Sequence, residues 1–248
     1  MSLRQSLLRI LGERRYLATL SATFQVMLHR GWLNKSFYRD VYFLKTHIRP
    51  GDVCIDIGAH LGYYTFELSR LTGPTGAVYA VEPITKFNSV IEAYIRQHGF
   101  TNIHLLKVAL GGDSETVEMG IPQVGDRKRF AYAKIIEKTD EFNFVETEQI
   151  RNEDPNRLFG DLPKIDFIKC DVEGFEVRLF TKMLPTVQKF RPRIVCELLS
   201  TVDRADFARL LAPLGYACYA LDNGRLQEID AYNDVTYFPH NYYFIPRG

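Results

Sequence analysis

The stretch VCIDIGAHLGYYTFELSRLTGPTGAVYAVEP, residues 53–83, decides the fold of this chain. It begins with a short apolar run, passes through a glycine-containing turn into a helical pattern that ends at Gly73, and finishes with a second apolar run. Two apolar strands joined through a helix favour a parallel pair with a right-handed crossover. The sequence therefore predicts an α/β domain built on a parallel sheet.

The same alternation continues on the C-terminal side of this stretch. We expect further elements in the following segments: a helix at 86–99, a strand at 102–110, a strand at 164–174, a helix at 175–190, a strand at 193–199, a helix at 203–212, and strands at 216–221 and 241–246. The last two strands have no convincing helix between them, so they should pair antiparallel. We expect a mainly parallel seven-stranded sheet with an antiparallel last strand.

The alternation is interrupted at residues 113–163. Short β-like runs there alternate with polar loops such as RNEDPNRLFGD at 151–161. This pattern predicts a hairpin or small lobe inserted beside the sheet. We therefore divide the chain into an N-terminal helical, basic extension at 1–49 and one α/β domain at 50–248 that carries the β-rich insertion.

The N-terminal extension is strongly basic. Residues 1–50 carry nine Lys or Arg against Glu13 and Asp40, a net charge of +7, whereas the rest of the chain holds 22 bases and 28 acids, a net charge of −6. Apolar residues recur with helical spacing over the first thirty residues. Two interpretations stay open for residues 1–30: a helix that packs on the body or on a second copy of the chain, and a helix that lies on an anionic membrane surface.

Composition excludes several classes of protein. With 248 residues, 46% hydrophobic and 25% charged, the chain is typical of a globular domain rather than a disordered or collagen-like one. The four cysteines are far apart and form no metal-binding or redox motif, which favours a reducing, cytoplasmic location. A nucleic-acid partner is not expected, because the body lacks a basic stripe.

Acidic residues stand where three of the expected parallel strands end, and the crevice of an open α/β sheet lies at this edge. Asp56 follows the first strand, Glu82 the second and Asp171 the fourth. A carboxylate after the second strand can bind a ribose diol. A carboxylate on the first strand would repel a pyrophosphate, but it suits a ligand with an ammonium group. S-adenosylmethionine has these groups.

Three motifs give a specific resemblance. Residues 53–83, the segment IDFIKCDVEGFE at 165–176 and the ending NYYFIP at 241–246 resemble the FkbM-type S-adenosylmethionine-dependent methyltransferase family. The resemblance covers roughly residues 50–248. Two departures are visible: His60 stands where the family usually has Asn, and residues 140–162 match the family pattern poorly.

The resemblance implies a Rossmann-like class I methyltransferase fold with S-adenosylmethionine as cofactor. The residues that it implies for cofactor binding are Asp56, Gly58, His60, Gly62, Tyr63 and Thr65 at the methionine end, Glu82 at the ribose, and Val108 and Ala109 beside the adenine. Alternatives stay open for some of them. The two glycines can serve backbone geometry alone, Asp56 can cap a helix, and Thr65 can cap the helix start or reach the methionine carboxylate.

Methyl transfer to a hydroxyl is helped by a base that removes the acceptor proton. Asp171 is our first choice for this base, followed by Glu173 and Glu197. Acids before a helix also interact favourably with its dipole, so a purely structural role stays open. The carboxylates could instead hold Mg²⁺, but we do not expect a metal. Lys169 should point to the same face as Asp171.

The favoured function is O-methylation of a small-molecule or saccharide hydroxyl by an S-adenosylmethionine-dependent enzyme. One alternative is a nicotinamide-dependent oxidoreductase, which Asp56 and the missing third glycine of a GxGxxG loop disfavour. The other is a non-catalytic cofactor-binding module that docks through its basic N-terminal helix.

Overall fold

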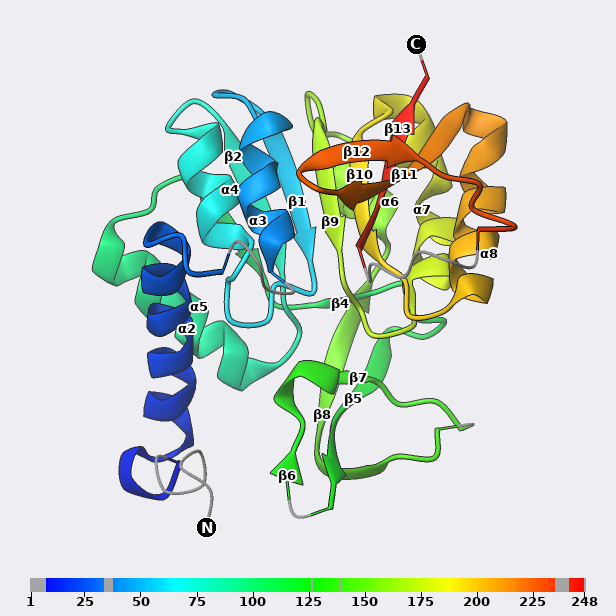
Figure 1. Ribbon diagram of the computed structural model, residues 1–248. Helices are drawn as coiled ribbons and strands as arrows, with labels where there is room; N and C mark the ends of the chain where they lie inside the picture. The colour runs from blue at the N-terminus through cyan, green and yellow to red at the C-terminus, as the bar shows by residue number, and fades with distance from the viewer. Residues whose placement is uncertain (1–7, 34–37, 126, 139, 235–240, 248) are drawn as a thin grey trace.

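The computed structural model describes residues 8–33, 38–125, 127–138, 140–234 and 241–247 (Figure 1). Within them, eight strands form the main sheet: β1 (Val53–Ile57), β2 (Ala77–Val81), β3 (Ile103–Leu106), β9 (Phe167–Cys170), β10 (Arg193–Glu197), β11 (Tyr216–Asp222), β12 (Arg225–Glu228) and β13 (Asn241–Pro246). Their order across the sheet is β12-β11-β13-β10-β9-β1-β2-β3. The chain therefore starts the sheet in its middle and builds outward in both directions.

Pairing in the main sheet is parallel from β3 to β10, and β13 runs antiparallel between β10 and β11. This arrangement confirms the expected Rossmann-like class I methyltransferase fold with its antiparallel last strand. The expected count of seven strands is too low, because β12 adds a hairpin at the edge. Asn223 and Gly224 both have positive φ in this turn, and the Asn-Gly pair was the sequence signal for it.

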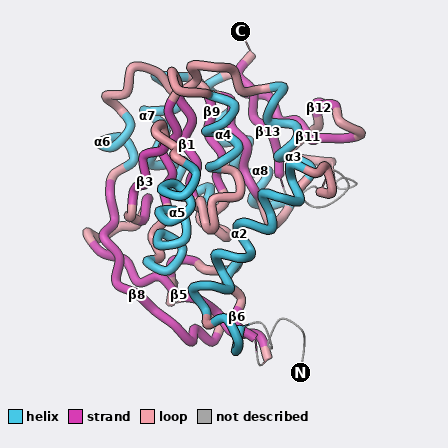
Figure 2. Tube along the Cα trace, turned by 90° about the vertical axis from the view of Figure 1, so that its left-hand side faces the viewer, coloured by secondary structure: helices cyan, strands magenta, loops and turns pink. Residues whose placement is uncertain are grey.

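Helices cover both faces of the main sheet, as the views in Figures 1 and 2 show. These helices are α4 (Thr65–Thr72), α5 (Thr85–His98), α7 (Glu176–Phe190) and α8 (Thr201–Leu211). On β1, Ile55 and Ile57 join the hydrophobic cluster under α7 and α8, whereas Cys54 joins a cluster on the opposite face. The strand is buried on both sides, which explains its continuous apolar run.

A second sheet lies beside the first where the sequence predicts an insertion. It is formed by β4 (Ala109–Leu110), β5 (Thr116–Val124), β6 (Arg127–Lys128) and β8 (Asn143–Glu153) in the order β4-β8-β5-β6, with β7 (Lys134–Ile135) pairing with β5. We call residues 109–153 the lobe. The predicted strand at 102–110 is thus divided between the two sheets.

Two further boundaries differ from the prediction. The predicted loop at 151–161 contains the end of β8 and the helix α6 (Pro155–Phe159). The Asp154 side chain caps this helix by accepting a hydrogen bond from the Asn156 amide at 2.8 Å, and Pro155 fits the first helical position. In the first crossover, α4 begins only at Thr65 because residues 58–64 form the turn that reaches the sheet edge.

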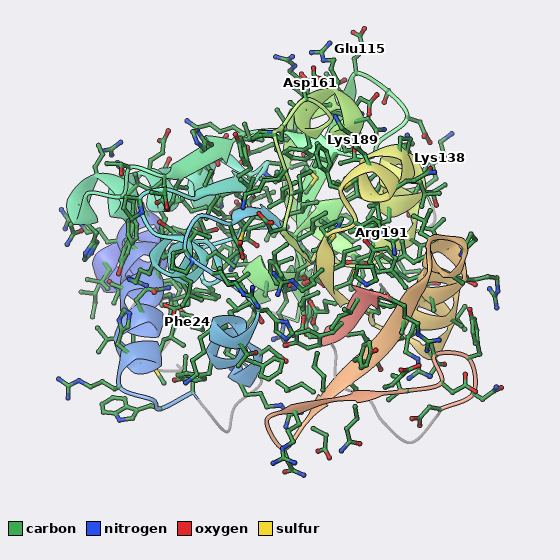
Figure 3. All side chains as sticks on the ribbon, turned by 90° about the horizontal axis from the view of Figure 1, so that it is seen from above. Phe24, Glu115, Lys138, Asp161, Lys189 and Arg191 are labelled. Atoms are coloured by element: carbon green, nitrogen blue, oxygen red, sulfur yellow. The ribbon has the colours of Figure 1, made fainter. Side chains whose placement is uncertain are left out.

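The N-terminal extension packs on the body of the protein. It contains α2 (Glu13–His29), α3 (Arg39–Phe43) and the short 3₁₀ helix η1 (Leu44–Thr46). Phe24 points from α2 toward the body (Figure 3), and Leu17 is fully buried. Residues 1–7 of the predicted helix lie outside the described residues. Within the described part of the chain, no helix combines the length and apolar character that a membrane span requires.

Candidate active site

A cavity of about 600 Å³ lies at the carboxyl edge of the main sheet. Its floor is the edge where β1 pairs with β2 on one side and with β9 on the other. Its other walls come from α2 and the lobe, which contribute residues such as Tyr16, Leu17 and Phe130. Ligands of open α/β sheets bind at such a switch point, because the crossovers there leave in opposite directions.

The turn after β1 depends on its two glycines. Gly58 has φ 82°, and a side chain there would overlap the carbonyl oxygen of Asp171 at the end of β9. Gly62 has φ 79°, and a side chain there would overlap the ring of Phe66. Gly58 lines the cavity, whereas Gly62 is not among its lining residues. Gly62 therefore shapes the turn, and Gly58 both shapes it and faces the cavity.

Asp56 is the penultimate residue of β1 and is buried. Its carboxylate accepts a hydrogen bond from the Thr65 hydroxyl at the start of α4. Burial raises the pKa of Asp56 to about 6, although the hydrogen bond from Thr65 opposes this rise. Thr65 does not line the cavity. Its role in this geometry is to fix the carboxylate of Asp56, which does line it.

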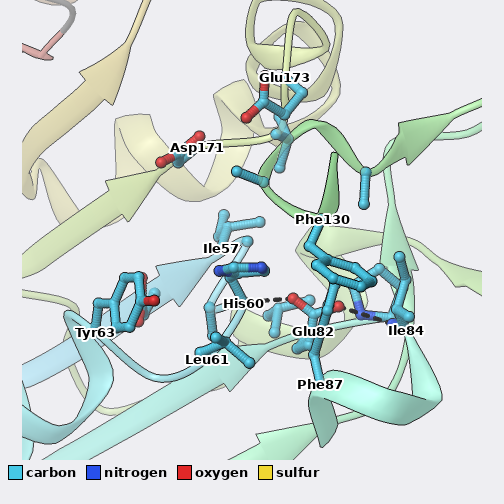
Figure 4. Close-up of a pocket in the computed structure, with 18 of the residues that line it drawn as sticks. Ile57, His60, Leu61, Tyr63, Glu82, Ile84, Phe87, Phe130, Asp171 and Glu173 are labelled. Carbon is cyan, nitrogen blue, oxygen red and sulfur yellow. Dashed lines mark hydrogen bonds between the residues drawn. The ribbon is translucent and has the colours of Figure 1, made fainter. Parts of the chain in front are cut away.

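Glu82 follows β2 and binds the turn after β1 and the start of the segment that leads to α5. Its two carboxylate oxygens accept hydrogen bonds from the backbone amides of His60 and Ile84, each at 2.8 Å (Figure 4). Burial raises the pKa of Glu82 to about 8, although both hydrogen bonds oppose the rise. Each oxygen accepts only one hydrogen bond from the protein, so the carboxyl group can still bind a diol, as an acceptor and, when protonated, also as a donor.

His60 lies between Glu82 and the carboxylates of Asp171 and Glu173 in Figure 4. Its backbone has φ 50°, and its ring packs edge-to-face against Phe87 with the centroids 4.5 Å apart. The Nε2 atom is buried and has no hydrogen-bond partner in the described structure. Burial lowers the pKa of His60 to about 4, so the ring is neutral and offers one unused polar atom at the cavity.

Asp171, Glu173 and Glu197 come together at the ends of β9 and β10. One carboxylate oxygen from each lies within 4.8 Å of the others. Burial and the neighbouring Asp171 raise the pKa of Glu173 to about 8 and that of Glu197 to about 9. Glu197 is therefore protonated at neutral pH and donates a hydrogen bond to Asp171. We call these three residues the acid cluster.

Lys169 supplies the positive charge beside the acid cluster. Its side chain is 1% exposed, and Nζ lies 3.5 Å from Oδ2 of Asp171 and 5.1 Å from the centre of the Tyr64 ring. Burial opposes its charge, but Asp171 and Tyr64 raise the pKa of Lys169 above its usual value, so it stays protonated. Burial also acts to raise the pKa of Asp171, yet Lys169 and the hydrogen bond from Glu197 hold it below the usual range.

The acid cluster is also the group of carboxylates that could hold a divalent cation. Lys169 already provides a cation beside Asp171. A divalent cation between the three carboxylates would lie next to this ammonium and would be repelled by it.

The cavity walls opposite the sheet edge, formed by α2 and the lobe, were not predicted from the sequence. Tyr16, Leu17 and Leu20 of α2 line the cavity, as do Met119 and Phe130 of the lobe. Their helical or strand spacing indicated apolar faces, but nothing in it specified a cavity. Val108, Ala109 and Tyr63, which the resemblance implies for cofactor binding, are also among the residues that line the cavity.

Four charged side chains join α2 to the lobe and to α5. Lys86 and Lys128 each form ion pairs with both Glu13 and Glu146, and the Lys128–Glu13 distance is 2.9 Å. We call these residues the ion quartet. Their side chains are between 20% and 38% exposed. Lys86 also lies 5.5 Å from the centre of the Phe130 ring, so the quartet directly supports the cavity wall.

A doubly wound sheet with carboxylates after β1, β2 and β9 places this protein in the class with a Rossmann-like methyltransferase fold. The family is shown by sequence: the chain belongs to the FkbM methyltransferases, because the family model described as Methyltransferase FkbM domain matches residues 56–218. The extension that carries α2 and α3 lies outside this match.

Individual relatives are more distant. A protein-L-isoaspartate O-methyltransferase from Methanocella arvoryzae is 31% identical over 86 residues, which are 35% of this chain and 42% of that protein. The chain therefore matches less than half of this curated relative.

Solved structures show the following similarities. A SAM-dependent O-methyltransferase from Thermotoga maritima is 15% identical, with a TM-score of 0.49 over 85% of this chain and 66% of the other. A methyltransferase FkbM from Methylobacillus flagellatus is also 15% identical, with a TM-score of 0.46 over 78% of this chain and 43% of the other.

Proposed function

We propose that this protein is an S-adenosylmethionine-dependent methyltransferase that methylates a hydroxyl oxygen of a small molecule or saccharide. One observation carries the proposal: Asp171, 3.5 Å from the Lys169 ammonium and next to Glu197, shares a cavity with Glu82 and the turn after β1. A base and a nucleoside-binding carboxylate in one cavity are what an enzyme of this kind requires. Membership of the FkbM family supports the choice of cofactor.

The residues around the turn fit this cofactor. Gly58 lets the backbone approach a ligand closely, and the buried Nε2 of His60 lacks a partner. Glu82 would hold the ribose hydroxyls, Asp56 would face the methionine ammonium group, and Val108 would flank the adenine. When bound, S-adenosylmethionine supplies an electrophilic methyl group that needs no further activation by the protein.

The protein's own task is to align the acceptor and remove its proton. Asp171 is the base in this mechanism, because it is the member of the acid cluster that is ionised at neutral pH. Glu197 and Lys169 hold its carboxylate in place by a hydrogen bond and an ion pair. Glu173 is protonated at neutral pH, and its carboxyl group can donate a hydrogen bond to an acceptor oxygen.

The acid cluster also bears on the acceptor class. Lys169 is the one lysine or arginine among the described residues that line the cavity, and its charge is already paired with Asp171. An ionised carboxylate or phosphate would therefore find no free cation there, so neutral hydroxyl compounds fit best. Four buried, unpaired cysteines support a reducing location, which we propose to be the cytoplasm.

A screen with methyl-labelled S-adenosylmethionine tests the proposed function. Neutral hydroxylated metabolites and sugars are incubated with the full chain, and products are read by the mass gain of one methyl group on oxygen. We expect a product that requires Asp171. Transfer to nitrogen or carbon alone would contradict O-methylation. Binding of NAD without binding of S-adenosylmethionine, measured by calorimetry, would contradict the methyltransferase and favour the oxidoreductase.

A further inference from the structure

The surface formed by residues 8–33 exposes large apolar side chains. Ile10 is 78% exposed, Trp32 is 65% exposed and Val26 is 53% exposed. The opposite side of the same segment is occupied, because Leu17 and Phe24 are buried against the body. Single exposed apolar residues are common on protein surfaces, but an exposed tryptophan is not. Three such side chains within one short segment therefore indicate an interaction surface.

The same surface is basic. Arg9, Arg14, Arg15 and Arg30 are exposed, and none of them forms an ion pair within the described residues. Glu13 is the one acidic residue in this segment, and its carboxylate is already bound by two lysines of the ion quartet. The surface of residues 8–33 therefore presents arginines without compensating acids.

The segment lies along the outside of the molecule. In Figure 1, α2 runs down the left side, away from the edge strand β12 and from α8, and in Figure 2 it faces the viewer. Nothing in the described structure covers its outer side. Its inner side lines the cavity through Tyr16 and Leu17.

We propose that the surface of residues 8–33 docks this protein on an anionic lipid bilayer. The arginines match the phosphates of acidic lipids, and Trp32 has the amphipathic ring that prefers the bilayer interface. A second copy of the chain is the poorer occupant, because it would bring four arginines against four arginines. Docking through this surface sets the cavity wall formed by α2 beside the membrane.

Vesicle binding tests this proposal, and the chain contains its own reporter. Trp32 is the single tryptophan of the sequence, so its emission reports the environment of this surface alone. The full chain is mixed with phosphatidylcholine vesicles with and without phosphatidylglycerol. We expect co-sedimentation and a blue shift of the emission only with the anionic vesicles, and weaker binding at high salt.

Charge reversal identifies the surface. The variant Arg14→Glu, Arg15→Glu, Arg30→Glu should bind anionic vesicles at least about 100-fold more weakly, since each basic residue near an anionic surface contributes about fivefold. Thermal melting shows whether this variant is folded.

A matched variant controls for net charge. The changes Arg209→Glu, Arg225→Glu and Arg247→Glu alter the charge equally at exposed positions on α8, β12 and the chain end after β13. This variant should keep most of the vesicle binding.

Any one of the following results would overturn the proposal. The first is absence of binding to anionic vesicles at low salt, and the second is an equal loss in both charge variants. The third is sedimentation without a change in Trp32 emission, which would show that another surface binds. The fourth is a concentration-dependent dimer that Val26→Arg dissociates, or tighter binding to an oligonucleotide than to the vesicles.

Discussion

The two walls of the cavity are built in different ways. The sheet wall lies at the ends of paired parallel strands. Its Asp56, Gly58 and Glu82 come from residues close together in the sequence, and both carboxylates are buried and bound by neighbouring hydrogen-bond donors. The acid cluster stands beside them on the neighbouring strands. The outer wall brings α2 and the lobe together from distant parts of the chain, and the half-exposed ion quartet joins them. One wall is fixed by local geometry, whereas the other depends on long-range contacts.

This difference has physical consequences. Buried carboxylates with raised pKa values make the sheet wall sensitive to pH. Half-exposed ion pairs are screened by salt, so the outer wall should be sensitive to ionic strength. Changes in the sheet wall should alter chemistry and cofactor affinity, and changes in the outer wall should mainly alter stability.

The largest effect is expected at Asp171. The Asp171→Asn variant should lower turnover of the acceptor found in the screen by about 10²- to 10⁴-fold, the usual contribution of a general base. Affinity for S-adenosylmethionine, measured by calorimetry, should change little. Asp113→Asn, at an exposed aspartate outside the cavity, is the control. Full activity of the Asp171→Asn variant would contradict the assignment of Asp171 as the general base.

The next effect is expected at Glu82. The Glu82→Gln variant should bind S-adenosylmethionine about 3- to 10-fold more weakly, because the amide nitrogen cannot accept a hydrogen bond where a carboxyl oxygen does and one hydrogen bond contributes about 0.5–1.5 kcal/mol. The matched change Glu148→Gln affects a nearby carboxylate that binds the Thr85 amide but does not line the cavity. Calorimetry should show nearly unchanged affinity for this control. Equal losses in the two variants would argue against ribose binding by Glu82.

Stability of the ligand-free protein should fall as the pH rises from 6 to 9. The folded-state pKa values of Glu82 and Glu197 are raised to about 8 and about 9, so their protonated forms stabilise the fold. This contribution to the free energy of unfolding is fully present below the pKa that the carboxyl groups have in the unfolded state. It is lost as the pH rises through their pKa in the folded state. We expect the thermal midpoint to fall by about 5 °C, since one kcal/mol corresponds to about 2–4 °C in a chain of this size.

Glutamine variants test the cause of this pH dependence. Glu197→Gln should flatten the dependence, because the amide cannot lose a proton. Glu118→Gln, at an exposed position of β5, should leave it unchanged. A midpoint that rises between pH 6 and 9 in the wild-type protein would contradict the assigned protonation of the sheet wall.

The smallest effect is expected in the ion quartet. Replacing Glu13 and Glu146 with Gln should lower stability by about 1 kcal/mol, discounted because the side chains are partly exposed to solvent. The loss should shrink at high salt. Glu92→Gln, in the exposed Lys107–Glu92 pair, should have a smaller effect in the same melting experiments. A loss in the quartet variant that does not depend on salt would show that packing, rather than charge, joins α2 to the lobe.

The same contrast explains what the sequence could predict. The parallel strands and the helices between them were predicted because burial on both faces produces continuous apolar runs, as on β1. The meeting of Asp171, Glu173 and Glu197 followed from strand ends sharing one edge. The sequence predicts that these side chains lie close together. It does not predict which of them are protonated, because their pKa values depend on burial and on Lys169.

The outer wall could not be predicted in this way. The cavity residues Tyr16 and Leu17 have the spacing of any packed helix, and spacing does not show which surface a helix covers. Glu13 and Lys128 are 115 residues apart, and no local pattern connects them. The hairpin that adds β12 differs from the outer wall, because its Asn-Gly turn is a local sequence signal. The prediction of seven strands did not include this hairpin.

A crystal structure of the full chain with S-adenosylhomocysteine tests the central claim most directly. We predict that the ribose hydroxyls bind the Glu82 carboxylate, that Asp56 lies at the amino-acid end of the ligand, and that the sulfur faces the acid cluster. A nucleoside bound elsewhere, with Asp56 and Glu82 remote from it, would contradict the account.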